Sequence, residues 1–362
     1  MNMKRTLVPL LAVPALFAFS GLGQEVRYAP KAGLSLTKTF SQKDETTLDD
    51  MSIVVNGQEQ DPSMVGMEQD ISNHLDVTLT DEYQTVADGR PTLLKRTYDK
   101  IASGANMKMS NQMMGDMTVN MTGKSALEDQ TVVFTWNETE KDYAVKFAKE
   151  DGGDAELLAD LTEDTDLRGF LPTSAVEEGA TWEVEPEQLR NVLAFGGSLK
   201  IDMEAEDMPE MMSGFGGGAQ NMPSADQFLG DIEGTITAEY RGTRDEDGVK
   251  VAAIHLAVAV SSAKDMTDFF KEAMEKAELP EGMEMKMDYK SVDMEYELEG
   301  EATLLWNLAG GHVHSFELNG KATSTIDMSM SMEMEGMGKM DFEMSMVLKS
   351  DNTSTLTATA SE

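Results

Sequence analysis

Apolar and polar residues alternate along many short stretches of this chain, a pattern typical of strands with one buried and one solvated face. The clearest stretch is Val292 to Glu299, where apolar side chains take the even positions and acidic side chains the odd ones. In the residues just before it, 283–289, the apolar side chains take odd positions instead. This slip predicts a tight turn or a β-bulge around Lys290 and Ser291.

Two hairpins are predicted from Asp-Gly pairs between alternating stretches, at residues 75–98 and 235–260. Each is followed by a Met-rich stretch and then by a second alternating pair, whose leading strand ends in Trp136-Asn137 or in Trp306-Asn307. This weak internal repeat predicts two related β units. We therefore expect a mainly β fold, with two related antiparallel curved sheets or half-barrels.

Two or three helices should cover the open faces of these sheets. Pro186 to Phe195 has proline in its first turn and glycines after its end, and Ala263 to Ala277 has an apolar face. A short third helix is predicted over Ala155 to Leu161. These features predict four parts of the chain. They are a signal peptide at 1–23, a first β-rich unit at 24–205, a Met- and Gly-rich linker at 206–232, and a second β-rich unit at 233–362.

The first residues have the order of a secretory signal peptide: Lys4 and Arg5, an apolar stretch, and then small residues. Cleavage is expected after Gly23 or after Ser20. The apolar stretch is shorter than the roughly 20 residues that a membrane-spanning helix needs. We therefore expect an exported protein, periplasmic or extracellular, with no stable membrane insertion after the leader is removed.

The formal net charge of -37 disfavours binding to nucleic acid and to anionic membrane surfaces, because both carry negative charge. The chain has no cysteine, and no Gly-x-Ser-x-Gly elbow presents a serine nucleophile. Its 66 acidic residues are too many for any one pair to be singled out as acid and base. The sequence therefore predicts no enzyme, no catalytic residues and no cofactor.

Methionine is the most unusual part of the composition, with 30 residues. Many recur at every second position, which places each run on one face of a strand. The adaptable thioethers either fill gaps in a core, as the Tyr and Leu side chains on the same faces suggest, or line a surface for an apolar ligand or an envelope partner. The candidate ligand-binding residues are Met283, Met285, Met287, Met294, Tyr296, Met328, Met330, Met332 and Met334.

Soft thioether ligands also suit Cu(I), so a Met-rich periplasmic Cu(I)-binding protein is an alternative. Its candidate ligands are His312, His314, Met328 and Met330. A purely structural module is the remaining alternative. The favoured hypothesis is an exported, non-enzymatic cell-envelope protein that binds an apolar ligand or partner on Met-lined sheet faces.

A resemblance to a known family rests on Phe170-Leu171-Pro172 and on the stretch from Val176 to Trp182, which contains Gly179. This order of proline, glycine and tryptophan resembles the signature of an uncharacterised family of exported bacterial proteins. The family has no assigned catalytic residues, so the resemblance implies none here. At the level of the fold, the chain is distantly similar to the half-barrel carriers of bacterial lipoproteins, in which a curved sheet shelters a lipid.

Overall fold

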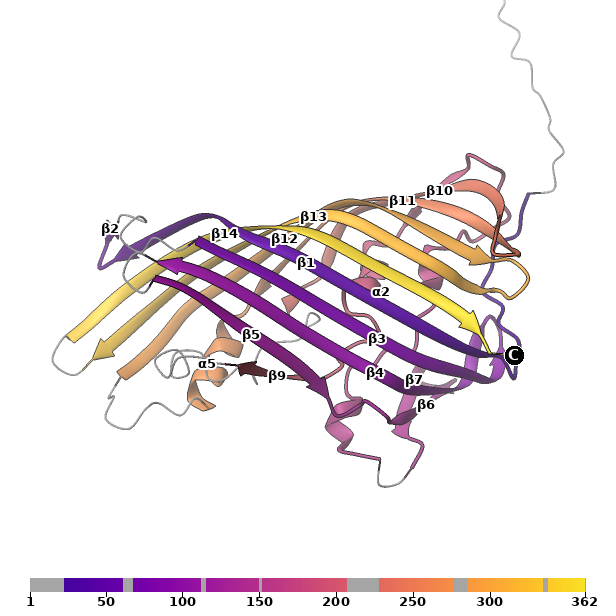
Figure 1. The fold of residues 1–362 in the computed structure, drawn as a ribbon, viewed down its shortest axis with the longest axis horizontal. Helices are drawn as coiled ribbons and strands as arrows, with labels where there is room; N and C mark the ends of the chain where they lie inside the picture. The colour runs from indigo at the N-terminus through magenta and orange to yellow at the C-terminus, as the bar shows by residue number, and fades with distance from the viewer. Residues whose placement is uncertain are drawn as a thin grey trace, which may run out of the picture.

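The described residues form one large antiparallel sheet with a few short helices (Figure 1). The computed structural model describes residues 23–60, 68–111, 115–149, 152–206, 228–276, 285–334 and 338–361. The predicted signal peptide, apart from Gly23, and most of the predicted linker lie outside these residues. The prediction of a mainly β, antiparallel fold is confirmed.

Most strands are long, and several extend over more than 20 residues. The strands of the first half are β1 (Ser35–Val55), β2 (Gln58–Gln60), β3 (Glu68–Ala87), β4 (Arg90–Asn111), β5 (Gly115–Ser125), β6 (Thr131–Asn137), β7 (Asp142–Phe147), β8 (Thr181–Val184) and β9 (Ile201–Glu206). Those of the second half are β10 (Ile232–Glu246), β11 (Val249–Asp265), β12 (Met285–Asn307), β13 (His312–Met334) and β14 (Gly338–Ala360).

The two halves of the chain share one sheet of 14 strands, so the prediction of two sheets is wrong. The order is β7-β6-β4-β3-β1-β14-β13-β12-β11-β10-β8, with β2, β5 and β9 paired beside this path. Strand β1 pairs with β14 from Leu36 opposite Ala360 to Val55 opposite Phe342. Without this pairing, β1 and β14 would each have unpaired backbone N–H and C=O groups along one edge. By pairing, the two strands satisfy each other's backbone hydrogen bonds. Within the described residues, β7 and β8 end the path, each paired on one side, with β6 and with β10.

Both predicted Asp-Gly hairpins are confirmed. Strands β3 and β4 join at Asp88-Gly89, and β10 and β11 join at Asp247-Gly248. The φ angles of Asp88 and Gly89 are 51° and 71°, and those of Asp247 and Gly248 are 50° and 82°. Two successive left-handed residues give the turn whose twist matches that of the flanking strands.

Two turns of similar build follow Asn137 and Asn307. The side-chain Oδ1 of Asn137 accepts from the backbone N–H of Thr139 at 2.9 Å, and that of Asn307 accepts from the N–H of Ala309 at 3.1 Å. In each turn the Asn carbonyl also accepts a backbone N–H four residues later, at 2.8 Å. The predicted slip of phase is present as well, as a break in the β12–β13 register between Tyr289 and Ser291.

The helices are shorter than predicted. A 3-10 turn at Pro186–Leu189 continues into α2 (Arg190–Leu193), and α5 covers Thr267–Lys276. Strand β11 continues to Asp265, so the first residues of the second predicted helix are strand. The third predicted helix is a single 3-10 turn at Ala155–Leu158. No helix among the described residues is long and apolar enough to cross a membrane.

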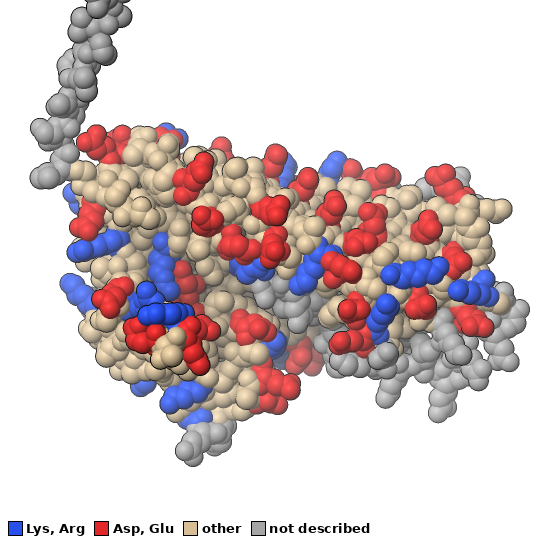
Figure 2. Space-filling view, turned by 180° about the vertical axis from the view of Figure 1, so that it is seen from behind, with Lys and Arg blue, Asp and Glu red and all other residues tan. Residues whose placement is uncertain are grey.

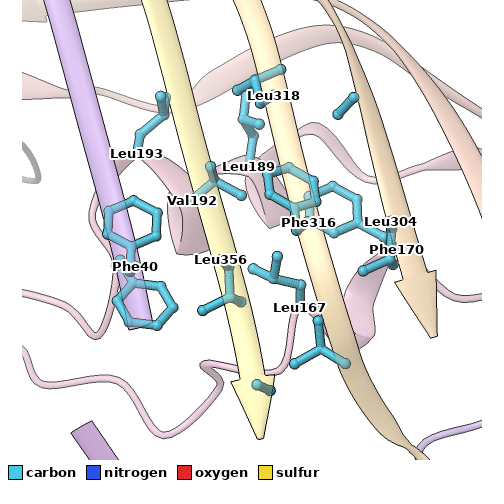
Figure 3. Packing of buried hydrophobic residues seen from close by; sticks show 14 of the residues in the cluster. Phe40, Leu167, Phe170, Leu189, Val192, Leu193, Leu304, Phe316, Leu318 and Leu356 are labelled. Carbon is cyan, nitrogen blue, oxygen red and sulfur yellow. The ribbon is translucent and has the colours of Figure 1, made fainter. Parts of the chain in front are cut away.

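The sheet curves around residues 152–200, which we call the inner segment (Figure 1). Leu167, Phe170 and Val192 of this segment pack against side chains from β1, β14, β13 and β12 (Figure 3). The Phe40 and Phe195 rings stack with their centroids 4.4 Å apart. We call the side of the sheet that carries Phe40 the inner face. Burial of these rings contributes to the hydrophobic stabilisation of this core.

A buried network of charges fastens the inner segment to the sheet. The Lys38 ammonium lies 2.9 Å from a carboxylate oxygen of Asp81 and 3.0 Å from one of Asp166. Arg96 donates from Nε to Asp81 at 2.8 Å and from Nη2 to the Thr165 hydroxyl at 2.9 Å. Burial favours a higher pKa for Asp81, but Arg96 and Lys38 outweigh it and lower this pKa to about 2. Because its charges are paired, this network is structural.

Candidate ligand-binding cavity

An open cavity of about 600 Å³ lies between the inner face of β1, β3, β4 and β5 and the chain from Leu193 to Met203. Its volume is within the range of 300–1,000 Å³ typical of small-molecule sites. The apolar part of its wall includes Ile71, Leu75, Met107, Met121, Phe195 and Met203. The cavity can therefore accommodate an apolar group of small-molecule size.

The strand register explains why these side chains share one face. Ile71 of β3 lies opposite Met107 of β4, and Ala105 of β4 lies opposite Met121 of β5. Side chains of directly opposed residues lie on the same side of a sheet. Ala105, which lines the cavity, has a small side chain and so leaves room between its larger neighbours.

A polar patch interrupts this apolar wall. Asn352, Asp44 and Asn73 lie opposite one another on the adjacent strands β14, β1 and β3. Gln42 Nε2 donates to one oxygen of the Asp44 carboxylate at 3.1 Å, and Asn352 Nδ2 donates to the other. Asp44, Gln42 and Asn73 line the cavity. The apolar cavity thus has a largely buried carboxylate in its wall.

Burial raises the pKa of Asp44 to about 6, although its hydrogen bonds to Gln42 and Asn352 act in the opposite direction. The nearby charge of Glu45 raises it further. Taking a carboxylate out of water disfavours its charged form unless a cation lies close by. Among the described residues, no cation lies close enough to lower the pKa of Asp44. Burial therefore decides the direction, and the pKa rises.

Two buried oxygens beside this carboxylate have no hydrogen-bond partner in the described part of the chain: Asn352 Oδ1 and Ser354 Oγ. Asn352 is 6% exposed and Ser354 is 0% exposed. Ser354 lies opposite Gln42 in the β1–β14 register. Most buried polar atoms in proteins have a partner, so two such oxygens on β14, next to the strand that carries Asp44, indicate a place where a water molecule binds.

A second, more apolar hollow of about 340 Å³ lies near the far end of β13 and β14. We call it the Met hollow. Met328, Met330 and Met344 line it together with Ile53 and Phe342. Two of the predicted ligand-binding residues therefore lie at a hollow, with Met344 as an unpredicted neighbour.

The other predicted ligand-binding residues of the described part lie on β12 and β13. Met287 lies opposite Met332, and Met294 lies opposite Ile326, so the register confirms that these runs share one face. Met285 lies opposite Met334, but their side chains are outside the described part, as is all of Met283.

The larger cavity, between β1, β3, β4, β5 and the inner segment, contains none of the predicted ligand-binding residues. Tyr296 does not line this cavity, but it interacts electrostatically with Asp44, which does. Burial and the charge of Asp44 both raise the pKa of the Tyr296 phenol, which places that ring near the polar patch.

The structure does not bring the four predicted copper ligands together. His312 is the first residue of β13 and Met328 lies 16 positions later on the same strand. At a rise of about 3.3 Å per residue, this separation is roughly 50 Å. His312 is buried, and one ring nitrogen lies 2.6 Å from the Val313 carbonyl oxygen. Among the described residues, no group of three or more His, Cys, Asp or Glu is placed to hold a metal.

Analysis of the sequence missed Asp44, Gln42 and Asn352, although one signal was available. Leu36, Lys38 and Phe40 are buried, and continuing their alternation puts Gln42 and Asp44 on the same face. An acidic residue in the buried phase of a strand is unusual enough to indicate a site. The covering chain from Leu193 to Met203 gave no comparable signal.

Comparisons with known proteins found no matching family model and no matching curated protein. Among solved structures, an outer membrane channel from Pseudomonas putida F1 is similar at 9% sequence identity, covering 92% of this chain and 97% of that chain, with a TM-score of 0.20. A mutant of a monoaromatic hydrocarbon channel is similar at 9% identity, covering 90% of this chain and 91% of that chain, with a TM-score of 0.12. At these TM-scores, neither similarity supports an inference about this protein.

Proposed function

We propose that this chain is an exported, non-enzymatic cell-envelope protein that binds an apolar small molecule in the cavity beside β3, β4 and β5. The cavity carries the proposal because about 600 Å³ of space faces apolar side chains instead of being filled by them. Protein interiors are normally close-packed, so an unfilled apolar space of this size is typical of a binding site.

The non-enzymatic part of the proposal is based on the polar groups in the cavity wall. Ser103 and His74 both line the cavity, but the Ser103 hydroxyl donates to the His74 backbone carbonyl at 3.2 Å instead of to the imidazole. A serine nucleophile needs a base at its hydroxyl. The exported location rests on the leader-like sequence from Lys4 to Gly23.

Uptake of diphenylhexatriene, a neutral apolar fluorophore, tests the binding function. We expect saturable uptake by the mature protein, and at least tenfold weaker uptake by the variant Ala105→Phe, whose ring would occupy the cavity. The matched control is Ala102→Phe, on the same strand between inward-facing Ile101 and Ser103, and therefore on the outer face. That control should bind as the unmodified protein does.

Native mass spectrometry of protein purified from a bacterial periplasm provides a second test. We expect an additional mass that is absent from Ala105→Phe. Protein that is ligand-free and also takes up no fluorophore would exclude the binding function. Accumulation of the intact chain in the cytoplasm, with its first 23 residues retained, would exclude export.

A further inference from the structure

We propose that the Asp44 carboxylate binds the ammonium group of a cationic amphipathic ligand whose apolar tail occupies the cavity. This inference rests on the proposed function and deepens it, because it names the chemical class of the ligand. It begins from the unusual position of Asp44, a largely buried carboxylate in the wall of an apolar cavity.

Among the described residues, no cation pairs with the Asp44 carboxylate. The buried Asp81, on the neighbouring strand β3, pairs with both Lys38 and Arg96. Asp44 accepts instead from the neutral amides of Gln42 and Asn352. Burying an unpaired charge is costly, and a cation brought by a ligand would remove that cost.

The Asp44 carboxylate matches an ammonium group in kind. An ammonium has three N–H donors and no acceptor, so its site must offer oxygens. Asp44 offers carboxylate oxygens in the wall of the cavity. An anionic head group would instead meet a negative charge at this place.

The apolar part of the ligand is accommodated on the other side of the patch. Ile71 and Leu75 lie in the cavity wall beside Asn73, and Met107 and Met121 continue the wall across β4 and β5. Unbranched thioethers adapt to tails of different shape. A straight or mildly branched chain therefore fits better than a rigid polar molecule.

The other titratable groups near the cavity are accounted for as follows. Glu45 and Tyr296 are the ones that interact electrostatically with Asp44. Lys200 also lines the cavity, but its ammonium lies 3.6 Å from the Asp160 carboxylate. His74 and Asp202 line the wall too, and both are exposed. Asp44 is therefore the buried carboxylate of this wall.

Displacement of diphenylhexatriene by dodecylammonium, dodecanol and dodecanoate, each below its micellar concentration, tests the inference. At pH 7.5 we expect dodecylammonium to bind at least tenfold more tightly than dodecanol, and dodecanoate to bind most weakly. Asp44→Asn should remove the preference for the amine and leave dodecanol unchanged.

The matched control is Glu45→Gln, which removes one carboxylate from the exposed outer face of the same strand, where Glu45 accepts from Ser72 at 2.9 Å. It is needed because acidic side chains are spread over the surface (Figure 2) and attract cations without a site. We expect this variant to keep the preference.

The pH dependence has opposite signs for the two charged ligands. Asp44 loses its charge as the pH falls through about 6, while an alkylammonium stays charged. Between pH 7.5 and pH 5, amine affinity should fall by about tenfold, and dodecanoate affinity should rise.

The outcomes separate the two proposals. Equal affinity for amine and alcohol, or a preference that survives in Asp44→Asn, overturns the ammonium site and leaves the apolar cavity in place. If none of the three compounds displaces the fluorophore because the fluorophore itself does not bind, the proposed function fails and this inference fails with it.

Discussion

Two buried aspartates on neighbouring strands show how surroundings decide what a carboxylate does. Asp81 of β3 is held between Lys38 and Arg96 and has a pKa of about 2, while Asp44 of β1 has amide neighbours only and a pKa of about 6. Both face the inner side of the sheet. The paired carboxylate holds the inner segment in place, and the unpaired one remains available for a ligand.

The variant Asp81→Asn should destabilise the protein by roughly 3–5 kcal/mol, because Arg96 would lose its ion pair and Lys38 would keep only the one to Asp166 among the described residues. Urea unfolding at pH 7 measures the change. The control Asp99→Asn, on the exposed face of β4, should shift the free energy of unfolding by less than about 1 kcal/mol.

The effect of Asp81→Asn should also depend on pH. The Asp81 pKa is lowered on folding, so its stabilising contribution is complete above about 4 and is lost as the pH falls through about 2. The difference between the two proteins should therefore shrink over that interval. Equal urea midpoints at pH 7 would show that the network contributes no net stability.

At the scale of single elements, the glycine and the tryptophan in the stretch from Phe170 to Trp182 have defined structural roles. Gly179 has a φ of 86°, a left-handed conformation that favours glycine, and the turn closes with the Ala180 N–H donating to Glu177 at 2.9 Å. Trp182 then donates from its indole N–H to the Phe170 carbonyl at 3.1 Å. The glycine thus shapes the turn before β8, and the tryptophan fixes β8 to the 3-10 turn at Arg168–Phe170.

The Met hollow allows a test of the copper alternative. Replacing Met328, Met330 and Met344 by Leu conserves most of the side-chain volume, so we expect a loss of stability below about 1.5 kcal/mol per site, measured by thermal unfolding. Packing needs only apolar volume, so Cu(I) competition with a chromogenic chelator should be the same before and after replacement. Loss of Cu(I) binding on replacement would favour the metal hypothesis over packing.

The sequence allowed local features to be predicted well. Asp88-Gly89 and Asp247-Gly248 fix their hairpins because left-handed turn residues act locally. The bulge after Tyr289 was visible as a change of alternation. Helix lengths were overestimated, since β11 extends to Asp265 through polar residues that strand and helix tolerate equally.

Contacts between distant parts of the chain were not predictable in the same way. The pairing of β1 with β14 joins residues that are more than 280 positions apart in the sequence. One example is the 2.7 Å contact between the Thr46 and Ser350 hydroxyls. The cavity depends on Leu193 to Met203 lying over strands from another part of the chain. The alternation of residues predicts which face of a strand a side chain takes, but not which strand lies beside it. The sequence therefore pointed to the Met runs of β12 and β13 and not to the cavity at β1, β3, β4 and β5.

At the scale of the whole molecule, the single sheet predicts cooperative unfolding. Two independent β units would unfold in two steps, but the β1–β14 pairing couples both halves along their full length. In the variant W136F/W182F, the remaining fluorescence reports on the buried Trp306 of the second half. Its urea transition should coincide with that of the far-ultraviolet circular dichroism. Two separated transitions would show that the halves are energetically independent.

The adjacency of the first and last strands also constrains when the protein can fold. Strand β1 emerges early during synthesis, yet its partner β14 ends at Ala360, close to the end of the chain. Contacts across such a distance form late because the intervening chain must first be ordered. The sheet therefore remains incomplete until β14 has been made, and the two halves cannot finish folding one after the other.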